Sequence, residues 1–535
     1  MKSASLQTSV YRALIPIAVL TLAGCGGGGG GGGGFFLPAT ASSVTLSGSA
    51  TFDSVPNETG ALVYPATTSK PIRGATVEVV SGSTVVASTA TDSNGAYSVV
   101  VPSNTSLIVR VKAQMSQSGT GPSWDVTVRD NTQSDAIYAM ETPMFLSGAA
   151  AALTRDIHAP SGWGGSSYSA SRVAGPFALL DTVYMAQAKV LSVAPSTTFP
   201  PLRVFWSENN VPGGNNPAAG QIGTTFFSNG SAGRAIYVLG KEGVDTDEYD
   251  SSVVAHEWGH YYQSAFSRDD SPGGGHSMTD LLDRRVAFSE GWGNAWSGIA
   301  LGRSNYTDSV GAGQASGSNV NLAAGLASGA GWYREASIHS ILWNLNSQIG
   351  FKAIHDTMTG SFKSGIAVTS IHPFAAAFYA AAPANASNLS ALLSGQAISP
   401  AADPFGGSET NNGDVSTALP MYRQATPGAA NSACVIDQAG TGNKLGNYAY
   451  LRFTVPAAGN YTIAVTGASA TDPDFVVYHG GQIAAADGLG SSESAVVALP
   501  AGESVLVITD FNNTSQSTAA SPSAQTPTCF TVTIQ

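Results

Sequence analysis

The chain has 535 residues, charged residues make up only 11% of it, and its formal net charge at pH 7 is −12. This length predicts several domains, because a single domain usually spans about 100–200 residues. The negative charge, and the lack of a basic patch with interleaved aromatic residues, argue against a phosphate-binding surface. We therefore expect no nucleic acid partner.

The first residues are typical of an export signal. A basic start at Lys2 precedes an apolar run, residues 13–22, which is too short for a hydrocarbon core that needs about 20 residues. The segment ends in Leu-Ala-Gly-Cys25, which resembles the processing site of bacterial lipoproteins. That resemblance implies a signal peptide over residues 1–24 and a lipid on Cys25 that anchors the chain to a membrane.

A run of glycines, residues 26–34, follows the lipidation site and predicts a flexible tether over residues 25–40. The sorting pattern of bacterial lipoproteins implies the outer membrane when glycine follows the acylated cysteine. We therefore expect the chain in the cell envelope, anchored to the outer membrane, or outside the cell.

Residues 41–113 carry the pattern of an all-β domain. Runs rich in β-branched residues, 44–48, 75–80 and 107–111, are separated by turn residues. The order of the segments that start at Pro71 and Thr91 resembles the small β-sandwich of the carboxypeptidase regulatory-like type. The resemblance implies this fold and says almost nothing about activity.

Residues 114–425 pass from strands to helices, which is an α+β pattern. Helical spacing of apolar residues predicts a first helix at 172–193. Strands are expected at 202–206, 224–227 and 235–239, and helices at 250–267, 279–300, 332–348 and 372–395.

Residues 432–535 return to short strands separated by Gly, Asn or Pro. By pattern and position this region resembles the pre-peptidase C-terminal β-sandwich that is appended to secreted bacterial peptidases. Its two cysteines, Cys434 and Cys529, either form a disulfide in an oxidising compartment or remain buried thiols. A disulfide would tie the first strand of the sandwich to the last.

The motif His-Glu-Trp-Gly-His at residues 256–260 carries the chemistry. On a helix His256 and His260 lie one turn apart on one face, where two imidazoles can hold Zn²⁺. Glu257 lies beside them and can take the proton of the bound water. The alternative is a core helix with two hydrogen-bonded histidines and a surface glutamate.

A catalytic zinc site needs a third protein ligand. Glu290, in Ser-Glu-Gly-Trp-Gly on a later helix, is the strongest candidate, and His276 is a rival that we rank lower because three glycines before it predict a loop. The pair of motifs resembles the gluzincin peptidases, the thermolysin and fungalysin clan. That resemblance implies zinc ligation by His256, His260 and Glu290, with Glu257 as general base.

The sequence departs from the clan at Asn294, where an Asp commonly orients a zinc histidine. An amide can accept the same hydrogen bond but brings no charge. The clan also uses a His or Tyr to stabilise the oxyanion. His339 and Tyr333 are the candidates for that role, and either could instead be a packing residue.

Substrate peptides in the clan add to an exposed strand edge. By order along the chain that edge would be formed by Thr225, Phe226 and Phe227.

These motifs predict a multidomain protein with a thermolysin-like α+β metallopeptidase domain, residues 114–425, flanked by two all-β sandwiches. The expected function is zinc-dependent hydrolysis of peptide bonds in extracellular proteins. The alternatives are a surface binding or adhesion lipoprotein with a structural or inactive zinc site, and a zinc hydrolase acting on a non-peptide substrate.

Ca²⁺ is a second candidate metal, because many secreted gluzincins use it. Oxygen ligands could come from residues 245–250 and 471–474, which otherwise are solvated turns.

Overall fold

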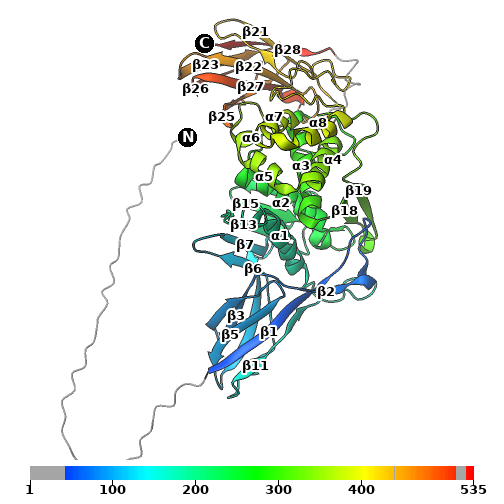
Figure 1. Cartoon of the computed structure of the whole chain (residues 1–535), viewed down its shortest axis with the longest axis vertical. Helices are drawn as coiled ribbons and strands as arrows, with labels where there is room; N and C mark the ends of the chain where they lie inside the picture. The colour runs from blue at the N-terminus through cyan, green and yellow to red at the C-terminus, as the bar shows by residue number, and fades with distance from the viewer. Residues whose placement is uncertain (1–42, 439, 514–525) are drawn as a thin grey trace, which may run out of the picture. The chain divides into compact units, whose positions relative to one another are not determined.

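The computed structural model describes residues 43–438, 440–513 and 526–535. Figure 1 follows them from blue at the N-terminus to red at the C-terminus. The expected signal peptide, the lipid site at Cys25 and the tether lie outside the described residues. Within the described part of the chain, no helix has the length and apolar character needed to cross a membrane.

The N-terminal β region contains two sheets. The five-stranded sheet comprises β1 (Ser43–Ser54), β2 (Thr68–Pro71), β5 (Ala96–Pro102), β11 (Ala152–Thr154) and β12 (Ile157–Ala159). The ten-stranded sheet begins with β3 (Ala75–Ser81), β4 (Thr84–Ala90), β6 (Ser106–Gln117), β7 (Trp124–Asp130), β8 (Ala136–Ile137), β9 (Ala139–Glu141) and β10 (Phe145–Leu146). Along β6 every second side chain is buried, as expected of a strand with one face on a core.

The predicted domain boundary at residue 113 is not a structural boundary. Strand β6 runs through it, and three later strands continue the same sheet: β13 (Leu202–Trp206), β14 (Phe226–Gly230) and β15 (Gly233–Val238). Strand β13 pairs in parallel with β7 on one side and with β15 on the other. This pairing with β7 satisfies backbone groups of β13 that would be exposed at an open edge. The two predicted domains therefore share one sheet, and they also share one apolar core.

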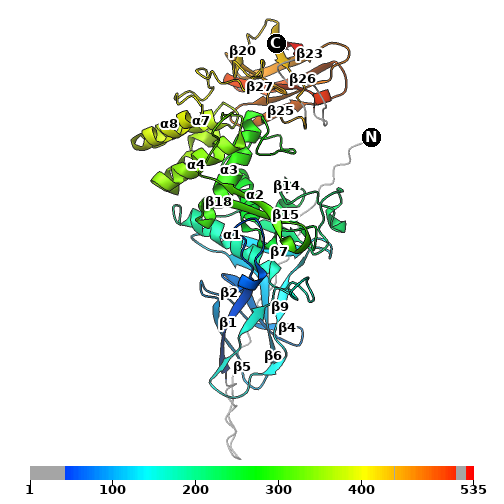
Figure 2. The same ribbon diagram turned by 90° about the vertical axis from the view of Figure 1, so that its right-hand side faces the viewer.

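The helices form a separate group that Figure 2 shows beside the ten-stranded sheet. They are α1 (Gly175–Leu191), α2 (Ser251–Phe266), α3 (Arg284–Leu301), α4 (Glu335–Ile349), α5 (Phe351–Thr359), α6 (Ser361–Ser364), α7 (Ile371–Ala381) and α8 (Ala386–Gly395). The single helix expected at 372–395 is two helices, because Pro383 lies between α7 and α8 and lacks the N–H that a continuous helix requires. A four-stranded sheet flanks this group and comprises β16 (Gly240–Lys241), β17 (Asp245–Thr246), β18 (Asn305–Val310) and β19 (Ser316–Asn321).

Helices α2 and α3 pack closely because glycine stands where they touch. A Cβ on Gly293 would lie 2.8 Å from the His256 ring. Gly291 serves another contact, since its Cβ would lie 2.4 Å from Cβ of Ile338 on α4. The two glycines therefore let α3 approach two different helices, α2 at Gly293 and α4 at Gly291.

The C-terminal region is a sandwich with its own apolar core. One sheet comprises β20 (Arg423–Gln424), β22 (Tyr448–Val455), β24 (Pro473–Tyr478), β25 (Gln482–Ala486) and β27 (Gly502–Asp510). The other comprises β21 (Asn431–Val435), β23 (Gly459–Thr466), β26 (Ser492–Leu499) and β28 (Thr528–Ile534). A disulfide joins Cys434 on β21 to Cys529 on β28, where the two residues are directly paired. The chain is multidomain, and its described residues form no closed barrel.

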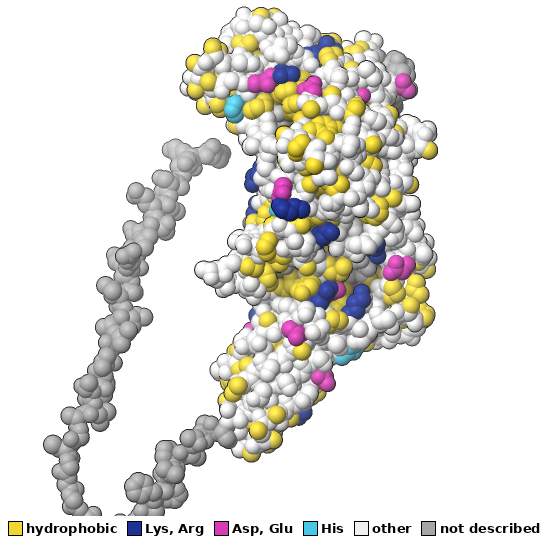
Figure 3. Space-filling view, viewed as in Figure 1, with side chains coloured by type: hydrophobic (Ala, Val, Ile, Leu, Met, Phe, Trp, Pro, Cys, Tyr) yellow, Lys and Arg dark blue, Asp and Glu magenta, His cyan; other side chains and the backbone are white. Residues whose placement is uncertain are grey.

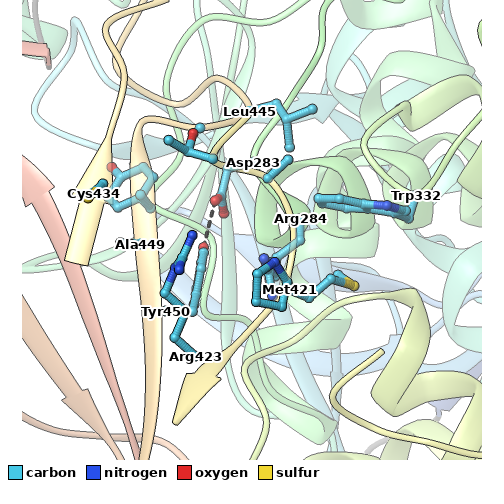
Figure 4. A pocket seen from close by; sticks show the side chains of 14 residues that line it. Asp283, Arg284, Trp332, Met421, Arg423, Cys434, Leu445, Ala449 and Tyr450 are labelled. Atoms are coloured by element: carbon cyan, nitrogen blue, oxygen red, sulfur yellow. Dashed lines mark hydrogen bonds between the residues drawn. The ribbon is translucent and has the colours of Figure 1, made fainter. Parts of the chain in front are cut away.

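The sandwich contacts the first turn of α3, as Figure 4 shows. The Tyr450 hydroxyl donates to Asp283 Oδ2 at 2.6 Å. Asp283 is the N-cap of α3, and its Oδ1 accepts the backbone N–H of Arg285 at 3.1 Å. The guanidinium of Arg284 lies 3.9 Å from the centre of the Tyr450 ring. These contacts hold the start of the helix that carries Glu290.

Candidate metal centre

Three donor atoms from two helices converge at one point. His256 Nε2 lies 3.1 Å from His260 Nε2 and 3.1 Å from Glu290 Oε2, and His260 Nε2 lies 3.4 Å from the same oxygen. Ligands held tetrahedrally at zinc bond lengths of about 2.0–2.1 Å would lie about 3.3 Å from one another. The separations and the donor types fit a zinc ion, so the structure brings together the three ligands that the sequence predicts.

The His256 ring is oriented by α3. Its Nδ1 lies 2.9 Å from Asn294 Oδ1, which turns Nε2 toward the centre. Because Oδ1 is an acceptor, His256 donates this hydrogen bond. Asn294 therefore lies where the sequence predicts a ligand-orienting residue, and it brings no charge to that ligand.

A carboxylate supports the other ring through a serine. Ser289 Oγ lies 3.2 Å from His260 Nδ1 and donates to Asp269 Oδ2 at 2.8 Å. His260 Nδ1 also lies 3.3 Å from Gln263 Oε1. Sequence reasoning missed Ser289, Gln263 and Asp269. The only signal was the position of Ser289 next to Glu290, since Asp269 belongs to a loop that follows α2.

The carboxylates around the three donor atoms stabilise positive charge there. Burial lowers the pKa of His260, but the charges of Glu290, Glu257 and Asp269 outweigh burial and raise it to about 10. Burial raises the pKa of Glu290, yet the charge of His260 and hydrogen bonds from three histidines bring it well below its usual value. A cation, whether a proton or a metal, is therefore stabilised between these side chains.

Glu257 is held at the wall of a cleft of about 710 Å³. Its Oε2 accepts the backbone N–H of Phe227 at 2.7 Å. Burial raises the pKa of Glu257, and the neighbouring histidines only partly offset that effect. Glu257 is therefore a better base than an exposed glutamate.

The predicted edge strand lines this cleft. Thr225, Phe226 and Phe227 all contribute to the lining, although β14 begins only at Phe226. Strand β14 is the last in its sheet, so its outer edge pairs with no strand of the described residues. One outward backbone group, the N–H of Phe227, is already bonded to Glu257.

His276 lies beside the three donor atoms but is not one of them, as its low rank as a third ligand predicts. Its Nε2 is 3.1 Å from Glu290 Oε2 and its Nδ1 is 2.8 Å from Glu335 Oε2. The three glycines before it do form a loop, and Lys444 Nζ fixes that loop by donating to the carbonyl of Gly275 at 2.9 Å. At this site the donor atoms that gather within 4.8 Å of one another are those of His256, His260 and Glu290, without His276.

The two residues expected to stabilise the oxyanion do not line the cleft. Tyr333 is buried, and its hydroxyl donates to Asn411 Oδ1 at 2.8 Å. His339 is also buried, on α4, and burial lowers its pKa to about 4. Both pack in the interior, whereas His276 lines the cleft.

Comparisons with known proteins add little to this geometry. No family model and no curated protein sequence matches the chain. The pre-peptidase C-terminal domain of collagenase from Bacillus anthracis is 13% identical over 21% of this chain and 94% of its own, with a TM-score of 0.17. CorA, a surface-associated copper-binding protein of Methylomicrobium album, is 12% identical over 21% of this chain and 98% of its own, with a TM-score of 0.17. PliG of Aeromonas hydrophila, a periplasmic inhibitor of g-type lysozyme, is 14% identical over 21% of this chain and 99% of its own, with a TM-score of 0.14. Likenesses this low carry no argument about function.

Removing the serine hydroxyl should weaken the metal site. We expect Ser289→Ala to raise the dissociation constant for Zn²⁺ about 10-fold to 100-fold, because His260 loses its link to Asp269. Competition with a chromophoric chelator measures this constant. Ser340→Ala, which deletes a buried helix hydroxyl on α4, is the matched control. Equal zinc affinity in the two variants would contradict the proposed role of Ser289 in linking His260 to Asp269.

Proposed function

We propose that the chain is a zinc-dependent endopeptidase that hydrolyses peptide bonds in extracellular proteins. The observation that carries the proposal is the convergence of His256, His260 and Glu290 beside Glu257, in a cleft bordered by an open strand edge. The proposal places the protein in the cell envelope, held to the outer membrane by a lipid on Cys25.

Each side chain has a separate task in this proposal. Bound zinc would supply a Lewis acid that acidifies water and polarises the scissile carbonyl. Glu257 takes the proton of the attacking water and passes it to the leaving amine. Both ring nitrogens of His276 face carboxylates, so both carry protons, and Nε2–H can donate to the oxyanion that develops on the carbonyl.

The strand edge supports a polypeptide as the substrate. An extended peptide can add to β14 through main-chain hydrogen bonds, which depend little on side-chain identity. Phe226 and Phe227 offer apolar surface to the same cleft. A chain that pairs with β14 would pass beside Glu257, because that carboxylate is bonded to the strand itself.

An adhesion or binding lipoprotein with a structural zinc ion is the second candidate. The observation in its favour is the 3.1 Å separation of His276 Nε2 and Glu290 Oε2. If His276 moved onto the metal as a fourth ligand, the site would be closed, as structural zinc sites are. The role of His276 therefore separates the two candidates.

Calcium is proposed at a second cluster. Carboxylate oxygens of Asp245, Asp247 and Asp308 lie within 4.8 Å of one another. Gln314, which is 1% exposed, donates its amide to the carbonyls of Ser309 and Thr246 at 2.7 and 3.3 Å.

Because the Gln314 amide nitrogen faces those two carbonyls, its Oε1 is left buried without a hydrogen-bond partner among the described residues. A neutral oxygen beside three carboxylates suits a hard cation that takes oxygen ligands. The other acidic residues of the expected stretch are engaged elsewhere, since Glu248 pairs with Arg172 and Asp250 accepts from Ser309.

The calcium cluster is linked to the cleft. The Thr225 hydroxyl donates to Asp247, and the same hydroxyl accepts the backbone N–H of Leu239 at 2.9 Å. Thr225 directly precedes strand β14 and lines the cleft. A cation bound at Asp247 would therefore help to hold the substrate edge in place.

The general-base assignment is tested by Glu257→Gln. We expect the variant to keep one zinc ion per chain and to lose at least about 100-fold in kcat, because the amide cannot take a proton. Metal analysis and hydrolysis of an unfolded protein measure the two quantities. Glu58→Gln, which changes an exposed glutamate, is the control. Hydrolysis by pure Glu257→Gln at the rate of the control would defeat the assignment.

Replacement of His276 decides between the two candidate functions. We expect His276→Asn to retain zinc and to lower kcat/KM about 100-fold, because a hydrogen bond to the oxyanion is lost. His158→Asn, at an exposed histidine outside the cleft, should match the unaltered protein. Loss of zinc from His276→Asn would instead identify a fourth ligand and favour the structural site.

The calcium proposal predicts stabilisation that does not depend on catalysis. Calcium at about 100 times its dissociation constant should stabilise the folded chain by about 2.7 kcal/mol, which a thermal unfolding experiment detects. We expect Asp308→Asn to remove most of this shift and Asp356→Asn, on exposed helix surface, to leave it unchanged. An equal shift in both variants would show that calcium binds elsewhere.

A further inference from the structure

A second hollow adjoins the catalytic cleft. Both are lined by Asp269 and Ser271, so this short loop separates them. The second hollow has a volume of about 510 Å³, and its far wall belongs to the C-terminal sandwich. The sandwich lines it with Asp474 and Val476 of β24, with Gln482 of β25, and with Asp487.

The sandwich presents a strand edge at this wall. Strand β25 is the last strand of its sheet, beyond β24, and its outer edge pairs with no other strand of the described residues. Most of its side chains are partly or fully exposed. Main-chain groups on such an edge can pair with an extended polypeptide.

The second hollow is negatively charged. Among the described residues no Lys or Arg forms an ion pair with Asp474 or Asp487. Oδ1 of Asp474 is buried without a hydrogen-bond partner in the described part of the chain. Charged side chains are sparse on the face shown in Figure 3, which fits the low charged fraction of the sequence.

The two arginines that also line the second hollow do not neutralise it. Arg268 pairs with Asp270 at 2.9 Å, and Arg285 pairs with Asp283 at 2.8 Å. Burial and the surrounding carboxylates raise the pKa of Asp474 to about 6. The unpaired negative charge of the second hollow therefore attracts a cation.

The spacing of these carboxylates does not suit a metal ion. In the described part of the chain, the acidic groups that bring three ligand atoms within 4.8 Å are at other places, and Asp474 and Asp487 are not among them. A lysine ammonium or an arginine guanidinium has several donors directed outward and can bond to carboxylates that lie farther apart. A basic side chain therefore matches the second hollow better than a metal ion does.

We propose that the second hollow is a substrate subsite for a Lys or Arg side chain of an extended polypeptide that reaches from the catalytic cleft to the C-terminal sandwich. The subsite rests on the proposed endopeptidase function, because the polypeptide enters it from the cleft. Asp474 and Asp487 bind the cation, Val476 contacts its aliphatic stem, and the edge of β25 pairs with the backbone. The enzyme then prefers unfolded chains that carry a basic residue at a fixed distance from the cleaved bond.

Binding of two matched peptides tests the subsite. The probes are a fluorescent 20-residue unfolded peptide with one lysine and the same peptide with norleucine, which keeps the stem and removes the charge. Glu257→Gln protein loaded with zinc is used, so that neither peptide is cleaved. We expect the lysine peptide to bind about tenfold more tightly than the norleucine peptide, as one charge-assisted hydrogen bond allows.

Variants then locate the effect. Adding Asp474→Asn and Asp487→Asn should reduce the tenfold ratio to about one, whereas Asp125→Asn, an exposed charge on β7, should preserve it. An unchanged ratio in the double variant would overturn the subsite, as would equal binding of the two peptides to the parent. If the endopeptidase proposal alone were wrong, neither peptide would be cleaved by wild-type protein although the lysine preference persisted.

Discussion

The whole arrangement depends on the contact distance between α2 and α3. His256 and His260 project from one helix and Glu290 from the other, and the three donor atoms meet only because Gly293 has no side chain to push the His256 ring away. Helix geometry places the two imidazoles one turn apart on α2. The position of the third donor, Glu290, depends instead on how α3 packs against α2. A metal site of this kind is therefore as rigid as the helix pair that carries it.

Segments far away in the sequence stabilise that helix pair and its cleft. Tyr450 of the sandwich bonds the N-cap of α3, and Lys444 fixes the loop that carries His276. On the opposite wall, Asp247 bonds Thr225 next to the edge strand. The C-terminal sandwich and strand β14 of the ten-stranded sheet therefore both contribute to the cleft, and the proposed basic subsite extends the contribution of the sandwich to substrate recognition.

The sequence predicted what local periodicity determines and missed what long-range packing determines. The spacing within 256–260 and the motif around Glu290 were sufficient to predict that three donor side chains on two helices converge. The position of His276 depends on Glu335 and Lys444, which are distant in sequence, and its glycine loop has no periodic signal. The predicted boundary at residue 113 is wrong for the same reason. Strands β7 and β13 pair side by side in the sheet although α1 lies between them in the sequence.

X-ray absorption at the zinc edge of the purified, zinc-loaded protein identifies the side chains that hold the metal. We expect two imidazole nitrogens and oxygen ligands from a carboxylate and water, with the imidazole signal halved in His260→Ala. A coordination sphere with three imidazoles, or a spectrum that does not change in His260→Ala, would contradict the assignment of His256, His260 and Glu290 as the metal site.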